Sequence, residues 1–304
     1  MSVTAAQGFR AAGVRAGLKA SGKPDLALVV NDGPLDTAAG VFTTNRVVAA
    51  PVVWSRRLLA GPEGGQPGHA RAVVLNSGSA NACTGAQGLR DTEATAARAA
   101  GLVSTEPVQV LVCSTGVIGE RIDMPVLLEG IDIAALALDD TPQAGTDAAA
   151  AIMTTDTVSK EDALTVGTGE QSWTIGGMIK GVGMLAPGLA TMLAVITTDA
   201  VLTPEQAQDA LASATMRTVN RINSDGCMST NDTVLLLASG ASGTTPSQDE
   251  LDEALTEVMS RLGRRLVADA EGATHDIAIT VSGAVSEEAA EAAARTVSSS
   301  NLLK

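Results

Sequence analysis

The amino-acid sequence predicts an α/β or α+β fold in which helices pack as layers on β-sheets. Short apolar runs rich in Val, Ile and Leu are mixed along the chain with longer segments of helical periodicity. Because strands and helices do not alternate regularly, we expect neither a TIM barrel nor a simple doubly wound sheet. The chain has 304 residues, of which 45% are hydrophobic, and it can therefore bury a large core.

Apolar runs bounded by turn residues are the expected strands, and segments with apolar residues every three or four positions are the expected helices. The expected strands are Leu26–Val30, Pro51–Trp54, Ala72–Leu75, Val108–Cys113, Ser172–Ile175, Met192–Ile196, Val234–Ala238 and Ile277–Val281. The expected helices are Ala86–Leu102, Pro125–Leu136, Gln143–Met153, Pro204–Thr218, Gln248–Ala270 and Glu287–Ser298. Two of them have clear start signals, because Thr203 precedes Pro204 and Ser247 precedes an acidic first turn.

The composition argues against several classes of function. The formal net charge of −14 at pH 7 opposes binding to nucleic acid, because a phosphate backbone requires a basic surface. The chain lacks a glycine motif for nucleotides, and its first residues lack the pattern of a signal peptide. The uncharged stretch 181–198 contains glycines, a proline and threonines, which favour a buried strand behind a loop over a membrane helix. We therefore expect a cytoplasmic protein without nucleic-acid or membrane partners.

The cysteines and histidines are too isolated to predict a metal centre or a disulfide framework. Cys83, Cys113 and Cys227 are far apart and odd in number, so we interpret them as small buried thiols. His69 lies in a Gly/Pro loop and His275 begins an expected strand, so a Ser/His/Asp triad has little support.

One junction near the middle of the chain predicts unusual chemistry. A glycine-rich approach, Gly181–Gly188, leads into an apolar run, and Thr191 stands where the two meet. A strained Ala190–Thr191 peptide bond would let the threonine hydroxyl attack the preceding carbonyl, and water would then cleave the resulting ester. The freed α-amine, with a pKa of about 8, would serve as the base for that hydroxyl. The alternative interpretation is an ordinary turn before a buried strand.

Polar segments beside apolar strands add to this junction. Each segment alone is typical of a turn. In chain order the informative stretches are Gln7–Gly13, Asn76–Gly85 (NSGSANACTG), Cys113–Ile122 (CSTGVIGERI), Ala151–Thr157 (AIMTTDT), Lys180–Ala200 (KGVGMLAPGLATMLAVITTDA), Ser229–Leu236 (STNDTVLL) and Asp269–Ala273. Together they resemble the ornithine acetyltransferase family, also called glutamate N-acetyltransferase or ArgJ, in the family's own order.

This resemblance implies a layered α-β-β-α sandwich of the ornithine acetyltransferase and DmpA type. It also implies self-cleavage between Ala190 and Thr191 into an α-subunit, residues 1–190, and a β-subunit, residues 191–304, which associate as a heterotetramer. The family moves an acetyl group from N2-acetylornithine to glutamate in arginine biosynthesis, through an acetyl ester on the terminal threonine. Some members also accept acetyl-CoA, which would then be a substrate, and no cofactor or metal is implied.

The resemblance also implies roles for individual residues. Thr191 would be the nucleophile, and the Thr115 hydroxyl and Gly116 backbone N–H would form the oxyanion hole. Thr154, Lys180 and Glu271, together with Thr191, would contact the amino-acid substrate. Without the family, Lys180 would be interpreted as a solvated loop charge and Glu271 as a charge at a helix end.

The family pattern normally continues beyond Lys304, with a GSDPNWGR-like motif and further substrate contacts. We therefore expect a C-terminally truncated chain with an incomplete β-subunit region and little or no transferase activity on its own. Two alternatives stay open. One is a self-processing N-terminal-threonine amidohydrolase or aminopeptidase, which would pass the acyl group to water. The other is an inactive truncated remnant.

Overall fold

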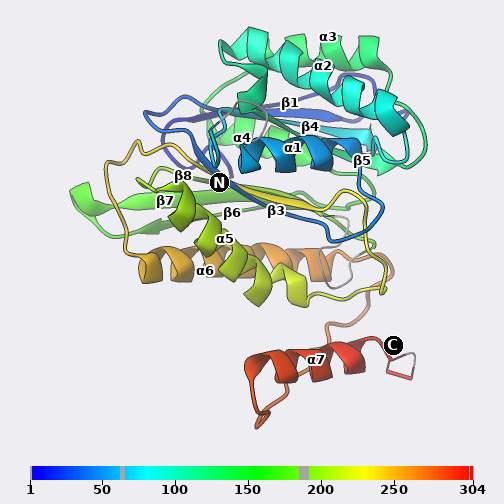
Figure 1. The fold of residues 1–304 in the computed structure, drawn as a ribbon, viewed down its shortest axis with the longest axis vertical. Coiled ribbons are helices and arrows are strands. Elements are labelled where there is room, and N and C mark those ends of the chain that lie inside the picture. The colour runs from blue at the N-terminus through cyan, green and yellow to red at the C-terminus, as the bar shows by residue number, and fades with distance from the viewer. Residues whose placement is uncertain (1, 62–65, 185–191, 301, 304) are drawn as a thin grey trace.

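Two stacked sheets form the centre of the molecule (Figure 1). The structure is a computed structural model that describes residues 2–61, 66–184, 192–300 and 302–303. Among these residues, the first sheet has the order β1-β2-β4-β5, with β1 (Phe9–Val14), β2 (Leu26–Asn31), β4 (Ala72–Ser79) and β5 (Val110–Val117). The second has the order β3-β9-β8-β7-β6, with β3 (Thr37–Phe42), β9 (Thr233–Ala238), β8 (Leu193–Thr198), β7 (Trp173–Lys180) and β6 (Lys160–Val166).

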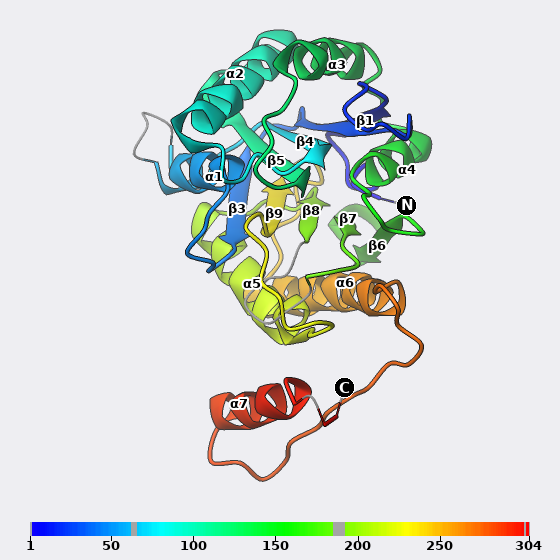
Figure 2. The same ribbon diagram turned by 90° about the vertical axis from the view of Figure 1, so that its right-hand side faces the viewer.

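Helices cover both outer faces of this sandwich. The helices α2 (Gly85–Val103) and α3 (Met124–Leu136) lie on the first sheet, and α5 (Pro204–Arg217) and α6 (Gln248–Ala268) lie on the second. Figure 2 shows α1 (Ala50–Ala60) and α4 (Pro142–Ala151) at opposite edges of the sandwich. Short 3-10 turns occur at Pro107–Gln109, Gly169–Gln171 and Val219–Arg221. The expected α-β-β-α layering is therefore confirmed.

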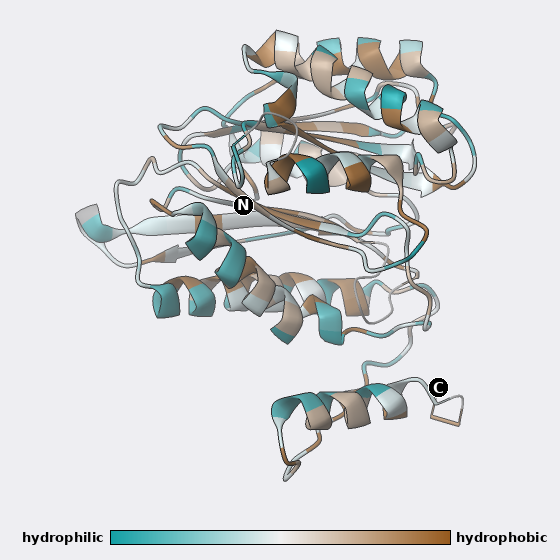
Figure 3. Cartoon of the chain, in the orientation of Figure 1, coloured by the Kyte–Doolittle hydropathy of each residue, from teal (hydrophilic) through white to brown (hydrophobic). Residues whose placement is uncertain are grey.

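The core follows the two-residue period of the strands. In β9, Val234 and Leu236 face α5 and α6, whereas Leu235 and Leu237 face the other sheet. Figure 3 shows hydrophobic residues along both sheets and hydrophilic residues on the outer helices. Strands buried on both faces appear in the sequence as continuous apolar runs. This is why the apolar runs located β2, β4, β5, β7, β8 and β9.

All six expected helices are confirmed to within about two residues at each end, a difference typical of helix boundaries. Both start signals form capping boxes. The Thr203 hydroxyl accepts from the N–H of Gln206 at 3.2 Å, and the Ser247 hydroxyl accepts from the N–H of Glu250 at 3.3 Å.

The expected strand Pro51–Trp54 is wrong, because these residues lie in α1. The β-branched and aromatic residues there suggested a strand. However, Pro51 lies in the first helical turn, where a proline is tolerated. Val52, Ser55 and Leu58 are buried at intervals of three residues, and Gly61 ends the helix with φ 83°.

Three strands were not predicted from the sequence, β1, β3 and β6, and all of them are sheet edges. An edge strand has one unpaired side and carries fewer apolar residues. β6 begins Lys160-Glu-Asp, and β1 and β3 are rich in alanine and glycine. These compositions lack the apolar runs on which the strand predictions depended.

The expected strand Ile277–Val281 is also wrong. The residues between α6 and α7 (Glu287–Ser298) are irregular, and Ile277 is 60% exposed. No strand among the described residues pairs with them. Figures 1 and 2 show α7 apart from the sandwich, and it is linked to the 3-10 turn by Arg221 and Glu287, 2.6 Å apart.

Two smaller expectations are also resolved. Cys113 is buried, but Cys83 and Cys227 are exposed, so the interpretation as buried thiols holds for one cysteine alone. In the part of the chain that the structure describes, no helix has the length and apolar character needed to cross a membrane. The apolar run after the glycine-rich approach forms β8, as expected.

Candidate active site

Two strands carry polar side chains into the buried space between the sheets. β4 and β5 do not end at their apolar runs as expected, but continue in parallel through the polar motifs. Ser77 pairs with Thr115, and Gly78 pairs with Gly116. Ser77 and Thr115 are buried, whereas Gly116 lies at the exposed end of β5. The backbone of Thr115 is therefore held within a paired strand, and it pairs with Ser79 as well as Ser77 because the register shifts there.

Gly116 occupies a position that excludes a side chain. Its φ is +131°, in the region that favours glycine, and that of Gly78 is +121°. A Cβ atom at Gly116 would lie 2.3 Å from the carbonyl carbon of Gly78 and 2.7 Å from the nitrogen of Ser79. The pairing of β4 and β5 is irregular at Gly78 and Ser79. The backbone of Gly116 therefore depends on close contact with a neighbouring backbone.

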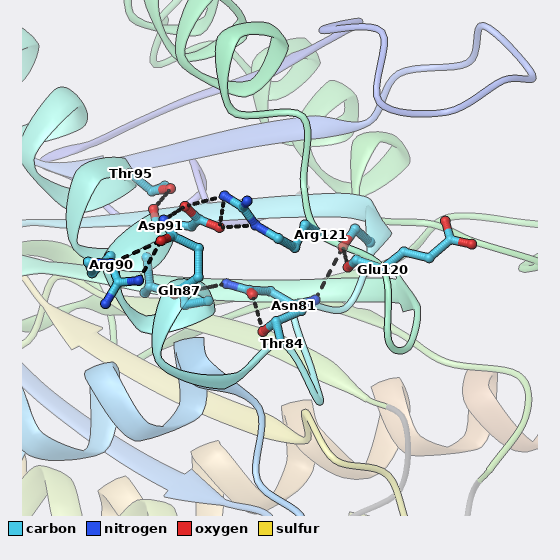
Figure 4. Close-up of polar contacts among 11 residues, drawn as sticks. Asn81, Thr84, Gln87, Arg90, Asp91, Thr95, Glu120 and Arg121 are labelled. Atoms are coloured by element: carbon cyan, nitrogen blue, oxygen red, sulfur yellow. Dashed lines mark hydrogen bonds and ion pairs between the residues drawn. The ribbon is translucent and has the colours of Figure 1, made fainter.

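The two motif loops beyond these strands are tied together (Figure 4). The Ser79 hydroxyl donates to the carbonyl of Glu120 at 3.2 Å, and Arg121 pairs with Asp91 of α2 at 3.1 Å. The Thr84 hydroxyl donates to Asn81 Oδ1 at 2.7 Å, and this bond closes the turn before α2. These contacts fix the segments that follow Gly78 and Gly116.

The polar segment before β9 joins the two sheets. The side-chain amide of Asn231 donates to the carbonyls of Ala80 at 2.6 Å and Ser114 at 2.8 Å. Its neighbour Asp232 is buried, and its Oδ1 accepts from the N–H of Met192 at 3.0 Å. The segment therefore places the start of β8 against the ends of β4 and β5.

The environment of Asp232 opposes ionisation of its carboxyl. Burial raises the pKa of its carboxyl to about 8, and the N–H of Met192, the nearby Ser229 and the charge of Lys180 oppose that rise. Its Oδ2 has no hydrogen-bond partner of normal geometry among the described residues. A buried carboxyl group thus lies beside the residue that follows Thr191 in the sequence.

Lys180 crosses from the second sheet to the first. It is the last residue of β7 and only 2% exposed, so the interpretation as a solvated loop charge is wrong. Its Nζ donates to Thr115 Oγ1 at 3.2 Å. Burial lowers the pKa of its ammonium group to about 8, whereas the charges of Asp156 and Asp232 favour the protonated form.

A buried ionic cluster lies next to the backbone of Lys180. Asp156 Oδ1 accepts from the N–H of Gly181 and from Lys160 Nζ, both at 2.8 Å. Asp156 Oδ2 accepts from the N–H of Thr154 at 2.9 Å. Lys160, which is fully buried, also pairs with Asp269 at 2.6 Å. Asp156 therefore holds Thr154 and the residue after Lys180 in one arrangement.

We expect Asp156→Asn to lower the free energy of unfolding by about 3 kcal/mol at pH 7, because a broken buried ion pair leaves an uncompensated charge. Burial opposes ionisation of Asp156, but Lys180, Lys160 and the N–H of Thr154 hold its pKa below the usual value. Since the folded pKa is the lower one, this stabilisation is complete above about pH 5 and is lost as the pH falls through the folded pKa.

Urea unfolding of wild type and variant at pH 7 and pH 3 tests this expectation, and the difference between them should shrink at pH 3. Asp132→Asn is the matched control, because Asp132 pairs with Arg98 at the surface and should contribute far less. If wild type and Asp156→Asn differed equally in free energy of unfolding at both pH values, the stabilising role of ionised Asp156 would be contradicted.

Glu271 lies beside the glycine-rich approach to the junction. It follows α6, in agreement with a charge at a helix end, and is exposed. Its N–H donates to the carbonyl of Val182 at 2.8 Å, and its carboxylate faces Gly183, where a Cβ would lie 3.5 Å from Oε2. Glu271 is thus next to the two residues that follow Gly181, on the approach to the junction.

The structure therefore brings Thr115, Gly116, Thr154, Lys180 and Glu271 to the same end of the sandwich. Ala190 and Thr191 lie outside the described residues. The described chain reaches Met184 on one side and resumes at Met192 on the other, and Lys180 pairs with Leu193 across β7 and β8. Before the junction Gly183 faces the Glu271 carboxylate, and after it Met192 contacts Asp232.

The site also includes residues for which the sequence predicted no role, namely Asp156, Lys160, Asn231, Asp232 and Asp269. All but Lys160 lie inside the motifs quoted above. A polar residue next to a buried strand could have indicated that these four belong to the site. Neither histidine takes part, since His69 contacts Asp36 at 2.8 Å and His275 contacts Thr274 at 2.9 Å. Within the described ranges, no group of His, Cys, Asp and Glu side chains could hold a metal ion.

Comparisons with known proteins show which family the sequence matches. A model of the ArgJ family matches residues 10–304. The arginine biosynthesis bifunctional protein ArgJ of Bifidobacterium longum is 58% identical over the whole chain, which covers 76% of that protein. The protein of the same name from Streptomyces coelicolor is 55% identical with the same coverage.

Solved structures give the same result. The ornithine acetyltransferase of Mycobacterium tuberculosis, solved with ornithine, has 52% identity and a TM-score of 0.58, covering 62% of this chain and 96% of its own. An aminopeptidase from Ochrobactrum anthropi, described as a variant of the Ntn-hydrolase fold, has 14% identity and a TM-score of 0.53 over 90% of this chain and 88% of its own. At that identity the likeness shows the fold alone.

Proposed function

The chain belongs to the ArgJ family, and we propose that it moves an acetyl group from N2-acetylornithine to glutamate. It is an acyltransferase of arginine biosynthesis, related over its whole length to bifunctional ArgJ proteins. The observation that carries the proposal is the buried Thr115 hydroxyl, which meets Lys180 at the end of the sandwich that also receives both sides of the Thr191 junction.

The proposed reaction has two halves. The Thr191 hydroxyl attacks the acetyl carbonyl carbon, and the threonine's α-amine takes the hydroxyl proton. The carbonyl oxygen becomes an oxyanion, which the Thr115 hydroxyl and the Gly116 N–H stabilise. Collapse breaks the C–N bond, the proton goes to the leaving amine, and ornithine departs. The amine of glutamate then attacks the acetyl ester in the same way and releases Thr191.

The substrate's amino-acid part would contact Thr154, Lys180 and Glu271. An ammonium group suits a substrate carboxylate, and the Glu271 carboxylate suits a substrate ammonium. Thr154 is positioned by Asp156, so its side chain is presented at a fixed place. No cofactor is needed for these steps, and acetyl-CoA would serve as a second acetyl donor at the same nucleophile. We propose a cytoplasmic location for this chemistry.

Self-cleavage at Ala190–Thr191 would make the nucleophile. The 62% of this chain that matches the solved ornithine acetyltransferase chain is close to the 190 of 304 residues that precede this bond, which supports the cut. The region 191–304 supplies β8 and β9, which lie between β7 and β3 of the region 1–190. The two regions therefore share one sheet, and we propose that they form part of a heterotetramer.

We expect the two chains made by cleavage to stay together under native conditions. Leu193, Val195, Leu235 and Leu237 all lie in the core between the sheets, where each buried side chain contributes about 1.5–3 kcal/mol. Size-exclusion chromatography should therefore give one peak, and denaturing mass spectrometry should give two masses from it. Separate elution of the smaller chain without denaturant would contradict this expectation.

Acetyl transfer is tested by following N2-acetylornithine and N-acetylglutamate with and without added glutamate. The proposed function predicts loss of N2-acetylornithine that depends on glutamate, with ping-pong kinetics. Equal loss without glutamate would support the amidohydrolase alternative. No loss in either case, from protein that is folded and cut, would support the inactive remnant.

A further inference from the structure

The hydroxyl hydrogen of Thr115 has no hydrogen-bond acceptor among the described residues. A threonine hydroxyl has one hydrogen to donate and two lone pairs to accept, whereas a lysine ammonium can only donate. In the contact with Lys180 the Thr115 oxygen must therefore be the acceptor. Its own hydrogen finds no acceptor among the described residues, although the side chain is only 1% exposed. A buried hydroxyl hydrogen without an acceptor indicates a missing partner.

Lys180 is itself well fixed. Its backbone pairs with Leu193 at the end of β7, and the next residue, Gly181, donates its N–H to Asp156. At 2% exposure, the ammonium group has little room to turn towards solvent. Its contact with Thr115 spans the two sheets, so the two side chains keep their geometry only while the sandwich is intact.

We infer that Lys180 is a positioning residue of the oxyanion hole, which fixes the Thr115 hydroxyl so that its hydrogen points to the reacting carbonyl oxygen. This inference rests on the proposed function and deepens it. Without the ammonium group the hydroxyl could rotate and present a lone pair to the developing negative charge. The preorganisation of the donor, on which oxyanion stabilisation depends, would then be lost.

The charge of Lys180 is what makes the contact directional. The titratable groups that face it are Asp156, Asp232, Lys160 and Lys19, and burial, the largest influence, lowers its pKa to about 8. A neutral lysine amine can accept the Thr115 hydrogen, which would withdraw it from the substrate. We therefore expect kcat to fall as the pH rises through about 8, whereas the α-amine of Thr191 gives a rising limb on the acid side.

A double-mutant cycle with Lys180→Met and Thr115→Ala tests the inference, using protein matched for cleavage by intact mass. We expect each single variant to lower kcat by about 10²–10³-fold. KM should stay nearly unchanged for Thr115→Ala and should rise for Lys180→Met, which also loses the proposed contact with the substrate carboxylate. The double variant should be no slower than the worse single variant, because both changes remove the same donor. Additive losses, or a raised KM with unchanged kcat for Lys180→Met, would overturn the inference and leave Lys180 as a carboxylate contact.

A second measurement covers the case in which Lys180→Met does not fold. Thr115→Ser keeps the hydroxyl and should keep the alkaline fall in kcat, whereas Thr115→Ala should lose it. The same alkaline fall in Thr115→Ala would overturn the inference. An absence of acetyl transfer in the folded, cut wild type would instead count against the proposed function, so the two failures are distinguishable.

Discussion

Replacement of Thr191 by alanine should leave one uncut chain of 304 residues and remove acetyl transfer. The variant keeps its fold but lacks the hydroxyl that would attack the carbonyl of Ala190, so no α-amine is released. It also lacks the nucleophile that would carry the acetyl group. The hydroxyl of Thr191 and its α-amine base act together. Loss of such a nucleophile lowers kcat by about 10³-fold or more. Intact-mass analysis and the acetyl-transfer assay measure the two losses separately.

Thr191→Ser is the matched control for this variant. Serine keeps the hydroxyl and the α-amine and loses only a methyl group, so cleavage and part of the activity should remain. Thr191→Ala protein should also elute like wild type, because β8 and β9 stay within the same sheet in the uncut chain. Two chains in the Thr191→Ala preparation, with a new N-terminus at residue 191, would show that another group performs the cut.

Burial decides which elements the sequence could predict. The central strands β2, β8 and β9 are buried on both faces, so their apolar runs are continuous and easily located. Edge strands such as β6 lack this pattern, because charged residues can project to solvent there. The four apolar residues Pro51–Trp54 were too few to reveal a period of 3.6, and only Ser55–Ala60 shows that they belong to a helix.

The site could be predicted in part from its motifs. The resemblance named Thr115, Thr154 and Lys180, and the structure places them at one end of the sandwich. It could not show that Lys180 is buried or that Asp156 holds both Gly181 and Thr154, because these contacts join segments far apart in the sequence. From the sequence alone, a lysine next to glycines is interpreted as a charged loop residue. Lys180 is buried only because the two sheets pack against each other. The ionic cluster around Lys160 is hidden for the same reason.

Gly116→Ala should damage both stability and catalysis. A Cβ there would lie 2.3 Å from the carbonyl carbon of Gly78, and backbone atoms cannot easily move away. The φ of +131° adds strain of about 1–3 kcal/mol for a residue with a side chain. Relief of the clash would push β5 away from β4 and displace the Gly116 N–H. Loss of one oxyanion donor then lowers kcat by about 10²–10³-fold.

Two other glycines separate these effects. Gly119, in the same motif, has φ +89° and open space around it, so Gly119→Ala adds backbone strain without the clash. Gly101, in α2, also has open space, and Gly101→Ala should be neutral or slightly stabilising. Thermal unfolding and kcat should therefore rank Gly116→Ala as the most damaged, Gly119→Ala as less stable but active, and Gly101→Ala as close to wild type. If Gly116→Ala and Gly119→Ala lose equal stability and keep equal kcat, contact with Gly78 does not position the oxyanion donor.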